Sequence, residues 1–194
     1  MIPDNRLSST LMLADWLIEK PDTEFNRTEG YEYGPSSLYN TDSNLDAALW
    51  RYTYTNDMIY MTHDESGITY ELETIEGASD VSVCFNQSAQ PVIAYMQNGK
   101  TYLKWYDTTS QTYIVTDLGT GLSSPRVLLD IKDKKSSQSD VILFYFRNNQ
   151  TLCVRYQRER FSIERVLHTT TPHRILRVGF NKINRIQFLI EEVL

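Results

Sequence analysis

The chain has 194 residues, of which 41% are hydrophobic and 12% aromatic, and 13 of them are Tyr. This is enough apolar material for a sizeable core, and the small number of breakers (8 Gly and 6 Pro) excludes a linker or low-complexity protein. The net charge of −6 disfavours nucleic-acid binding, so we expect no direct contact with DNA.

The charge is distributed unevenly along the chain. Residues 1–125 contain 6 Lys/Arg and 18 Asp/Glu, a net of −12, whereas residues 126–194 contain 13 Lys/Arg and 7 Asp/Glu, a net of +6. A dipolar chain of this kind can attract copies of itself, or a charged neighbour, head to tail. The alternative is that both regions are the solvated surface of one mixed fold.

Residues 1–20 predict a short helix. Ser8, Ser9 or Thr10 could cap it, and Pro21 would end it. Its apolar side chains must dock on something, either the chain's own sheet or a neighbouring subunit. The predicted assembly contacts of this helix are Leu11, Met12, Trp16 and Leu17.

The same N-terminal residues do not read as a signal peptide, because they lack a basic region and Asp15 interrupts a short apolar run. No apolar stretch reaches the length of about 18 residues that a membrane span needs. We therefore expect a protein made in a cytoplasm, with no membrane association.

Residues 20–46 are rich in Asp, Glu, Asn, Ser and Tyr and show no clear period. They predict a long extended arm that wraps a surface. We therefore divide the chain into a helix and arm, residues 1–46, and a β domain, residues 47–194.

From Trp50 onward, segments in which apolar and polar residues alternate, or in which β-branched and aromatic residues follow one another, predict one strand after another. Asn98-Gly99 and Asn148-Asn149 mark tight turns between neighbouring strands. The strand candidates are WRYTYT, DMIYMT, ITYELETI, VSVCFN, PVIAYM, TYLKWY, TYIVTDL, PRVLLDI, DVILFYF, TLCVRY, FSIERVL, RILRVGF and NRIQFLI.

The strands form a repeat. Residues 91–106 align with residues 141–156 at a constant offset of 50, and each copy has one further strand before it and one after it. The unit is therefore four antiparallel strands in about 45 residues, which is typical of β-propeller blades. A truncated copy follows at the C-terminus and a degraded one precedes around residues 50–75, and strands near the start could complete the last blade.

The predicted fold is all-β: an incomplete β-propeller-like array of about three blades, or a sandwich, with a short N-terminal helix and arm. An array that does not close leaves strand edges and apolar faces uncovered. This is a physical argument for assembly with other subunits.

No sequence motif indicates a catalysed reaction, so we expect a protein that is not an enzyme and has no cofactor. Two histidines in a loop, His168 and His173, have no nearby Cys or acid to form a metal site, and we expect no metal. Cys84 and Cys153 lie in predicted strands far apart, which indicates buried, reduced thiols.

Arginines gather in the C-terminal part of the chain, most densely around the QRER turn at residues 157–160. A basic face interleaved with aromatic residues could bind nucleic acid, but ion pairing to the acidic half of a neighbouring subunit, or a mixed surface, is the interpretation we favour. The predicted assembly contacts in this region are Arg155, Arg158 and Arg160.

Several segments carry a resemblance to a family. The SPRVLLD strand, the DVILFYF strand, the RYQRERF turn and the closing VGFNKINRIQF resemble structural virion proteins of tailed-bacteriophage tails, over about residues 80–190. This resemblance implies a structural role in a ring-like tail assembly and transfers no catalytic residues.

The sequence thus predicts a structural component of a phage tail: an adaptor, a collar or a mount for fibres or spikes. It would be located in the virion tail after synthesis in the host bacterial cytoplasm, and its partners would be other tail proteins and copies of itself. The alternative is a tail module that binds a host-surface glycan, with stacking faces at Trp50, Tyr52, Tyr54, Tyr102 and Trp105.

Overall fold

The chain is all-β. In the part of the chain that the structure describes there are 15 β-strands, one short 3₁₀ helix and no α-helix. The helix predicted within residues 1–20, with Leu11, Met12, Trp16 and Leu17, lies outside the described residues. The computed structural model describes residues 25–28, 31–34, 48–64, 66–86, 88, 90–130, 140–181 and 186–193.

Three of the sheets are four-stranded antiparallel meanders whose strands pair in chain order. The first contains β2 (Tyr31–Gly34), β3 (Ala48–Thr55), β4 (Met58–His63) and β5 (Thr69–Thr74). The second contains β6 (Ser79–Phe85), β7 (Pro91–Gln97), β8 (Lys100–Asp107) and β9 (Thr112–Thr120). The third contains β10 (Leu122–Asp130), β11 (Asp140–Arg147), β12 (Thr151–Tyr156) and β13 (Arg165–Thr169), with the 3₁₀ helix η1 (Gln157–Glu159) between the last two.

The fourth sheet joins the two ends of the described chain. Strand β1 (Phe25–Thr28) pairs antiparallel with β14 (His173–Asn181), which in turn pairs with β15 (Ile186–Glu192). An early strand therefore completes the truncated C-terminal copy, as the repeat pattern suggested. The number of sheets is four rather than about three, because the degraded copy near residues 50–75 forms a complete sheet once β2 is added to it.

The segment predicted as an extended arm contains secondary structure. β1 and β2 both lie within residues 20–46, where the sequence predicts a connection without strands. Both strands have four residues and a polar composition, so their local pattern is too weak to identify them. They are strands because the longer β14 and β3 offer free edges with which they can pair.

The repeat predicted at an offset of 50 residues is present in the structure. β7–β8 and β11–β12 are equivalent hairpins, and Asn98-Gly99 and Asn148-Asn149 take positive φ at both central positions, as a type I′ turn requires. The pairing differs by one residue, because Gln97 faces Lys100 in the first hairpin whereas Arg147 faces Thr151 in the second.

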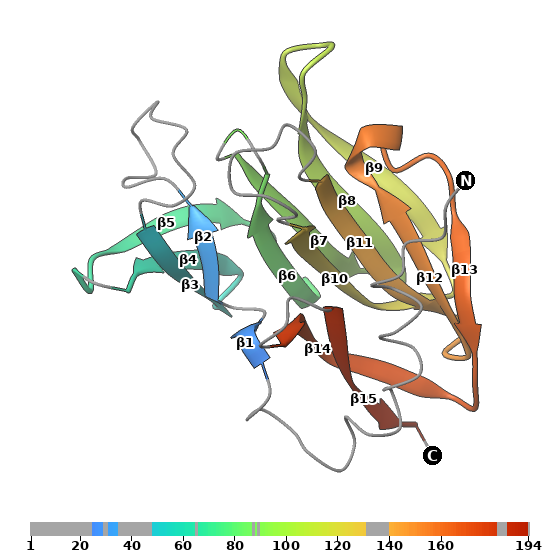
Figure 1. Ribbon diagram of the computed structural model, residues 1–194. Coiled ribbons are helices and arrows are strands. Elements are labelled where there is room, and N and C mark those ends of the chain that lie inside the picture. Colours follow the sequence, from blue (N-terminus) through green and yellow to red (C-terminus); the bar gives the residue numbers. More distant parts are fainter. Residues whose placement is uncertain are drawn as a thin grey trace.

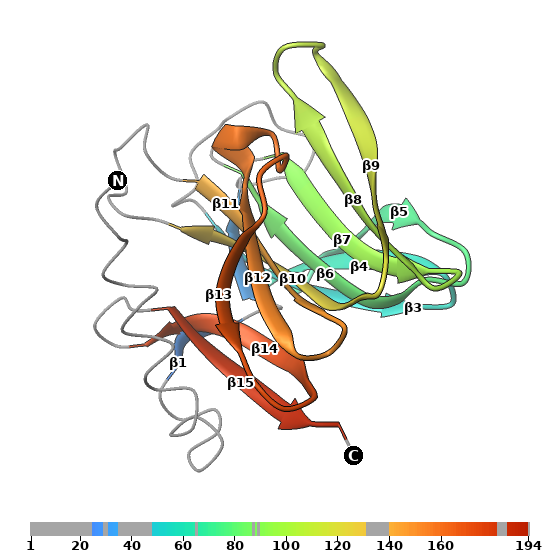
Figure 2. The ribbon, with the colours of Figure 1, turned by 90° about the vertical axis from the view of Figure 1, so that its right-hand side faces the viewer.

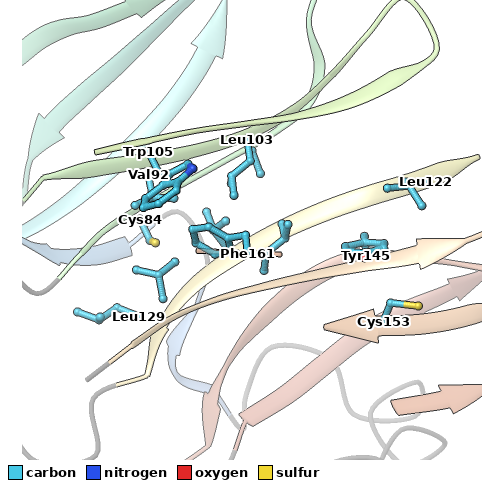
Figure 3. Close-up of a cluster of buried hydrophobic side chains, with 13 residues drawn as sticks. Cys84, Val92, Leu103, Trp105, Leu122, Leu129, Tyr145, Cys153 and Phe161 are labelled. Carbon is cyan, nitrogen blue, oxygen red and sulfur yellow. The ribbon is translucent and has the colours of Figure 1, made fainter. Parts of the chain in front are cut away.

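The core consists of layers between successive sheets. Alternate residues of the third sheet enter two different clusters: Val141, Leu143 and Tyr145 of β11 face the second sheet, and Ile142 and Phe144 face the fourth. The cluster between the second and third sheets also contains both cysteines, which are reduced and buried as predicted (Figure 3). A further cluster around Trp50 and Phe85 joins the first and second sheets.

The four sheets fan around a shared centre, as blades do in a propeller. In Figure 1 the first sheet lies at the left, the second and third occupy the centre and the right, and the fourth lies at the bottom. Figure 2 shows β14 and β15 packed along the third sheet. The first and fourth sheets approach each other through β1 and β2, whereas the three clusters of buried side chains join the other neighbouring pairs.

Replacing Phe188 tests whether the fourth sheet is part of one cooperative core. Its ring packs edge to face on Phe144, with ring centroids 4.9 Å apart, and it is almost fully buried. We expect Phe188→Ala to lower the free energy of unfolding by about 3–5 kcal/mol, measured by urea denaturation, with a single transition. Leu176→Ala, an exposed position on β14, is the control and should cost less than about 1 kcal/mol. A cost for Phe188→Ala equal to that of the control would show that the fourth sheet is not integrated.

Candidate functional site

A pocket of about 440 Å³ lies at the junction of the second and third sheets, and we take it as the candidate site. Four segments contribute to it: the residues after β6, the end of β8 with its turn, the start of β11, and η1 with the residue that follows it. It is therefore built from both sheets, at the end where η1 lies close to β8 and β11 (Figure 1).

The turn after β12 explains why η1 sits at this junction. Arg160 and Phe161 both adopt left-handed backbone conformations (φ 54° and 53°), each of which costs an L-residue about 1–2 kcal/mol. The bend drives the Phe161 ring into the cluster between the two sheets, where it meets Trp105 edge to face at 5.4 Å. Burial of this ring offsets the strain, and the same bend leaves the side chains of Arg158 and Arg160 at the rim of the pocket.

Asp107 and Arg160 form the first ion pair of the pocket. Arg160 Nη2 donates to Asp107 Oδ2 at 2.8 Å, and the same carboxylate accepts from Ser110 Oγ and from the backbone N–H of Thr109. Burial alone would raise the pKa of Asp107, but these hydrogen bonds and the guanidinium together lower it below its usual value. Asp107 is therefore a fixed carboxylate at neutral pH.

Asp140 and Arg158 form the second ion pair. The backbone N–H of Arg158 donates to Asp140 Oδ1 at 3.0 Å, and Arg158 Nη1 lies 3.4 Å from Asp140 Oδ2. Burial is the main cause that raises the pKa of Asp140, and nearby Asp130 and Glu159 also raise it. The two aspartates of the pocket therefore differ: several hydrogen-bond donors surround the carboxylate of Asp107, whereas few surround that of Asp140.

Arg155 is turned inward and does not reach the pocket rim. Its Nε donates to the Tyr145 hydroxyl at 2.7 Å and its Nη1 to the carbonyl oxygen of Phe161 at 3.0 Å. Tyr145 in turn donates to Glu164 at 2.6 Å, and Arg147 also bonds this carboxylate. The network fastens the η1 turn and the start of β13 to the centre of the third sheet.

The three arginines predicted as assembly contacts are thus placed unequally. Arg158 and Arg160 line the pocket and are half-exposed, whereas Arg155 is mostly buried, and all three pair with carboxylates of their own chain. Only Asp107 among these carboxylates belongs to the acidic region 1–125. Sequence reasoning missed Asp107 and Asp140, because their partners lie 53 and 18 residues away.

Strand β9 is a second feature of functional interest. Among the strands that the structure describes, it is the outermost of the second sheet and pairs on one side, with β8. It exposes Tyr113 (40%) and Val115 (55%), and its one charged residue, Asp117, is paired with Lys100 at 2.7 Å. A long, nearly uncharged edge with exposed apolar side chains is a site where another chain can pair.

The aromatic residues suggested as glycan-stacking faces belong mainly to the core. Trp50 is fully buried and Trp105 nearly so, and the hydroxyls of Tyr52 and Tyr54 bond backbone carbonyls. Tyr102 is half-buried and stacks on Tyr95. These side chains therefore form no open stacking face.

Within the described ranges, no group of three or more His, Cys, Asp or Glu side chains is placed to hold a metal ion. None of the helical residues described by the structure forms a segment able to span a lipid bilayer. Comparison of the chain with protein-family models, with curated proteins and with solved structures finds no match.

The network around Glu164 makes stability depend on pH. Burial would raise the pKa of Glu164, but the Tyr145 hydroxyl, Arg147 and Arg155 lower it below its usual value. A lowered native pKa contributes stability above the unfolded value of about 4.3 and loses it as the pH falls through the native pKa. We expect Glu164→Gln to cost roughly 1–3 kcal/mol at pH 7 and progressively less below pH 4, measured by urea denaturation at each pH. A cost that stays constant with pH would contradict this account of the network.

Proposed function

We propose that this protein is a structural component of a bacteriophage tail, an adaptor, collar or mount for fibres or spikes, which acts through contacts between many copies. The single observation that carries the assembly part is the exposed edge of β9, with Tyr113 and Val115 beside it. The resemblance of about residues 80–190 to tail proteins supports the phage part. The partners would be copies of this chain and other tail proteins, and the location the virion tail after synthesis in the bacterial cytoplasm.

The comparison of edge strands favours β9 as the contact. β13, the outermost strand of the third sheet, has five residues and begins with Arg165, which is paired with Glu159. β5, the outermost strand of the first sheet, carries Glu71 and Glu73. Short length and charge protect an edge from pairing with another chain, whereas β9 has nine residues and its one charged residue, Asp117, is already paired with Lys100.

The radial arrangement of the sheets suits a multi-copy assembly. A contact between the β9 edge of one copy and a different surface of the next is heterologous, and heterologous contacts close into a ring when the rotation between copies allows it. Six arginines already form ion pairs with carboxylates of the same chain: Arg147, Arg155, Arg158, Arg160, Arg165 and Arg174. The proposed contact would therefore be made mainly by apolar side chains and backbone hydrogen bonds.

A charge placed on β9 tests the proposed contact. Val115 lies opposite Lys104 on β8, so Val115→Glu adds a charge that the fold tolerates. We expect the wild-type chain to be an oligomer by light scattering, and Val115→Glu to weaken assembly by at least about tenfold in dissociation constant, since taking a charged side chain out of water at the contact is costly. Val166→Glu, at an exposed valine of β13, is the matched control and should assemble like the wild type. A wild-type chain that stays monomeric at every concentration would refute the proposal for self-assembly.

Removal of residues 1–20 tests the contacts predicted at Leu11, Met12, Trp16 and Leu17. The deletion ends before β1 begins at Phe25, so the pairing of β1 with β14 is retained. We expect the shortened chain to keep its melting temperature and to form smaller particles in light scattering. If its particles contain as many copies of the chain as those of the full-length protein, these residues are not assembly contacts.

A further inference from the structure

The fourth sheet obtains one of its strands from the other end of the described chain. β1 lies against β14 on the side opposite β15, so β14 is the middle strand. The pairing of β1 is short: it has three register pairs with a shift between Phe25 and Arg27, whereas β14 and β15 have seven register pairs. Strand pairing is made by backbone N–H and C=O groups, so β1 of another copy of the chain is chemically able to pair with β14 in the same way.

β1 is tied closely to the first sheet and only distantly to the rest of the fourth. Two residues, Glu29 and Gly30, separate β1 from β2, which pairs with β3 of the first sheet. The strand that β1 pairs with begins much later in the chain, at His173. A change in the direction of β1 relative to β2 therefore needs rotation at two positions, one of which is a glycine with wide backbone freedom.

Apolar packing does not require the first and fourth sheets of one chain to be neighbours. Buried clusters join the first sheet to the second, the second to the third and the third to the fourth, and the described side chains form no such cluster between the fourth and the first. The faces that the two end sheets turn away from these clusters are polar, with Arg51 and Thr53 on β3 and the Arg174–Glu191 pair on the fourth sheet. The two sheets approach each other through β1 and β2.

The charges of the two end regions favour one direction of contact between copies. Residues 25–76, which contain β1 and the first sheet, have 2 Lys/Arg and 10 Asp/Glu, a net of −8. Residues 173–194, which contain β14 and β15, have 4 Lys/Arg and 2 Asp/Glu, a net of +2. Opposite charges favour the first sheet of one copy beside the fourth sheet of the next, whereas two first sheets repel each other.

We propose that β1 is an exchangeable strand: in the assembly, β1 of one copy pairs with β14 of the next copy in place of that copy's own β1. The partner is a second copy of this chain, and the surface is the edge of β14 that β1 covers. Because the strand makes the same backbone hydrogen bonds in both arrangements, exchange costs little free energy and joins copies head to tail. It goes beyond the proposed contact of β9, which belongs to another sheet.

Disulfide trapping between two differently tagged full-length chains tests the exchange. Thr28 and Gly179 are direct register partners, and opposite residues of antiparallel strands lie close enough for a disulfide. One chain carries Thr28→Cys and the other Gly179→Cys, and the two are co-expressed and then oxidised. We expect a disulfide-linked dimer that contains both tags on a non-reducing gel. Because Gly179 is buried, Phe25→Cys with Asn181→Cys repeats the test at a second register position.

Thr28→Cys mixed with Leu176→Cys is the matched control. Leu176 is exposed and lies on the same strand as Gly179, but it is not a register partner of β1. It is three residues from Gly179, about 10 Å along the strand, which is too far for a disulfide with Thr28. The control should therefore give at least about tenfold less linked dimer than the register partners. A single chain with both Thr28→Cys and Gly179→Cys measures pairing within one copy.

The proposal is overturned if the mixed chains give no more linked dimer than the control at both register positions, whether or not the doubly substituted chain closes a disulfide of its own. If this result is obtained while the wild-type chain is an oligomer by light scattering, the exchange of β1 fails and the proposed β9 contact stands. The two contacts are therefore tested separately.

Discussion

The structure depends on burying both faces of the third sheet. A four-stranded meander has two faces and can cover neither by itself, so it must lie between two other sheets. In β11 successive residues point alternately to opposite clusters: Leu143 towards the second sheet and Phe144 towards the fourth. Every residue of this strand except Arg147 is buried, which is why its sequence, DVILFYFR, is a nearly continuous apolar run.

The positions of the charged and polar side chains follow from this constraint. Where the layers end, strand termini and turns from two sheets meet, and buried carboxylates there pair with arginines that stay in contact with water. Asp107 and Arg160 come from different sheets, and their pairing joins the ends of those sheets. Tyr145, Arg155 and Glu164 form the corresponding network inside the third sheet. The arginines of the C-terminal region therefore stabilise the fold, and this weakens the idea of a basic surface that seeks an acidic partner.

The edge of β9 and the pocket are different parts of the same architecture. The edge of β9 is what remains when a sheet ends without a further strand, and the proposed assembly would use that edge. The pocket is what remains when two sheets diverge at their ends, where buried carboxylates pair with half-exposed arginines.

The sequence by itself determined the all-β class, the four-stranded repeat, the turns at Asn98-Gly99 and Asn148-Asn149 and the buried thiols. These follow from local alternation and turn chemistry, which operate over a few residues. The tertiary structure alone decided that β1 and β2 are strands, that Arg155 turns inward and that Asp107 and Asp140 share a pocket. Short polar strands form only when a longer strand offers its edge, and ion pairs across 18 or 53 residues exist only once the sheets have packed.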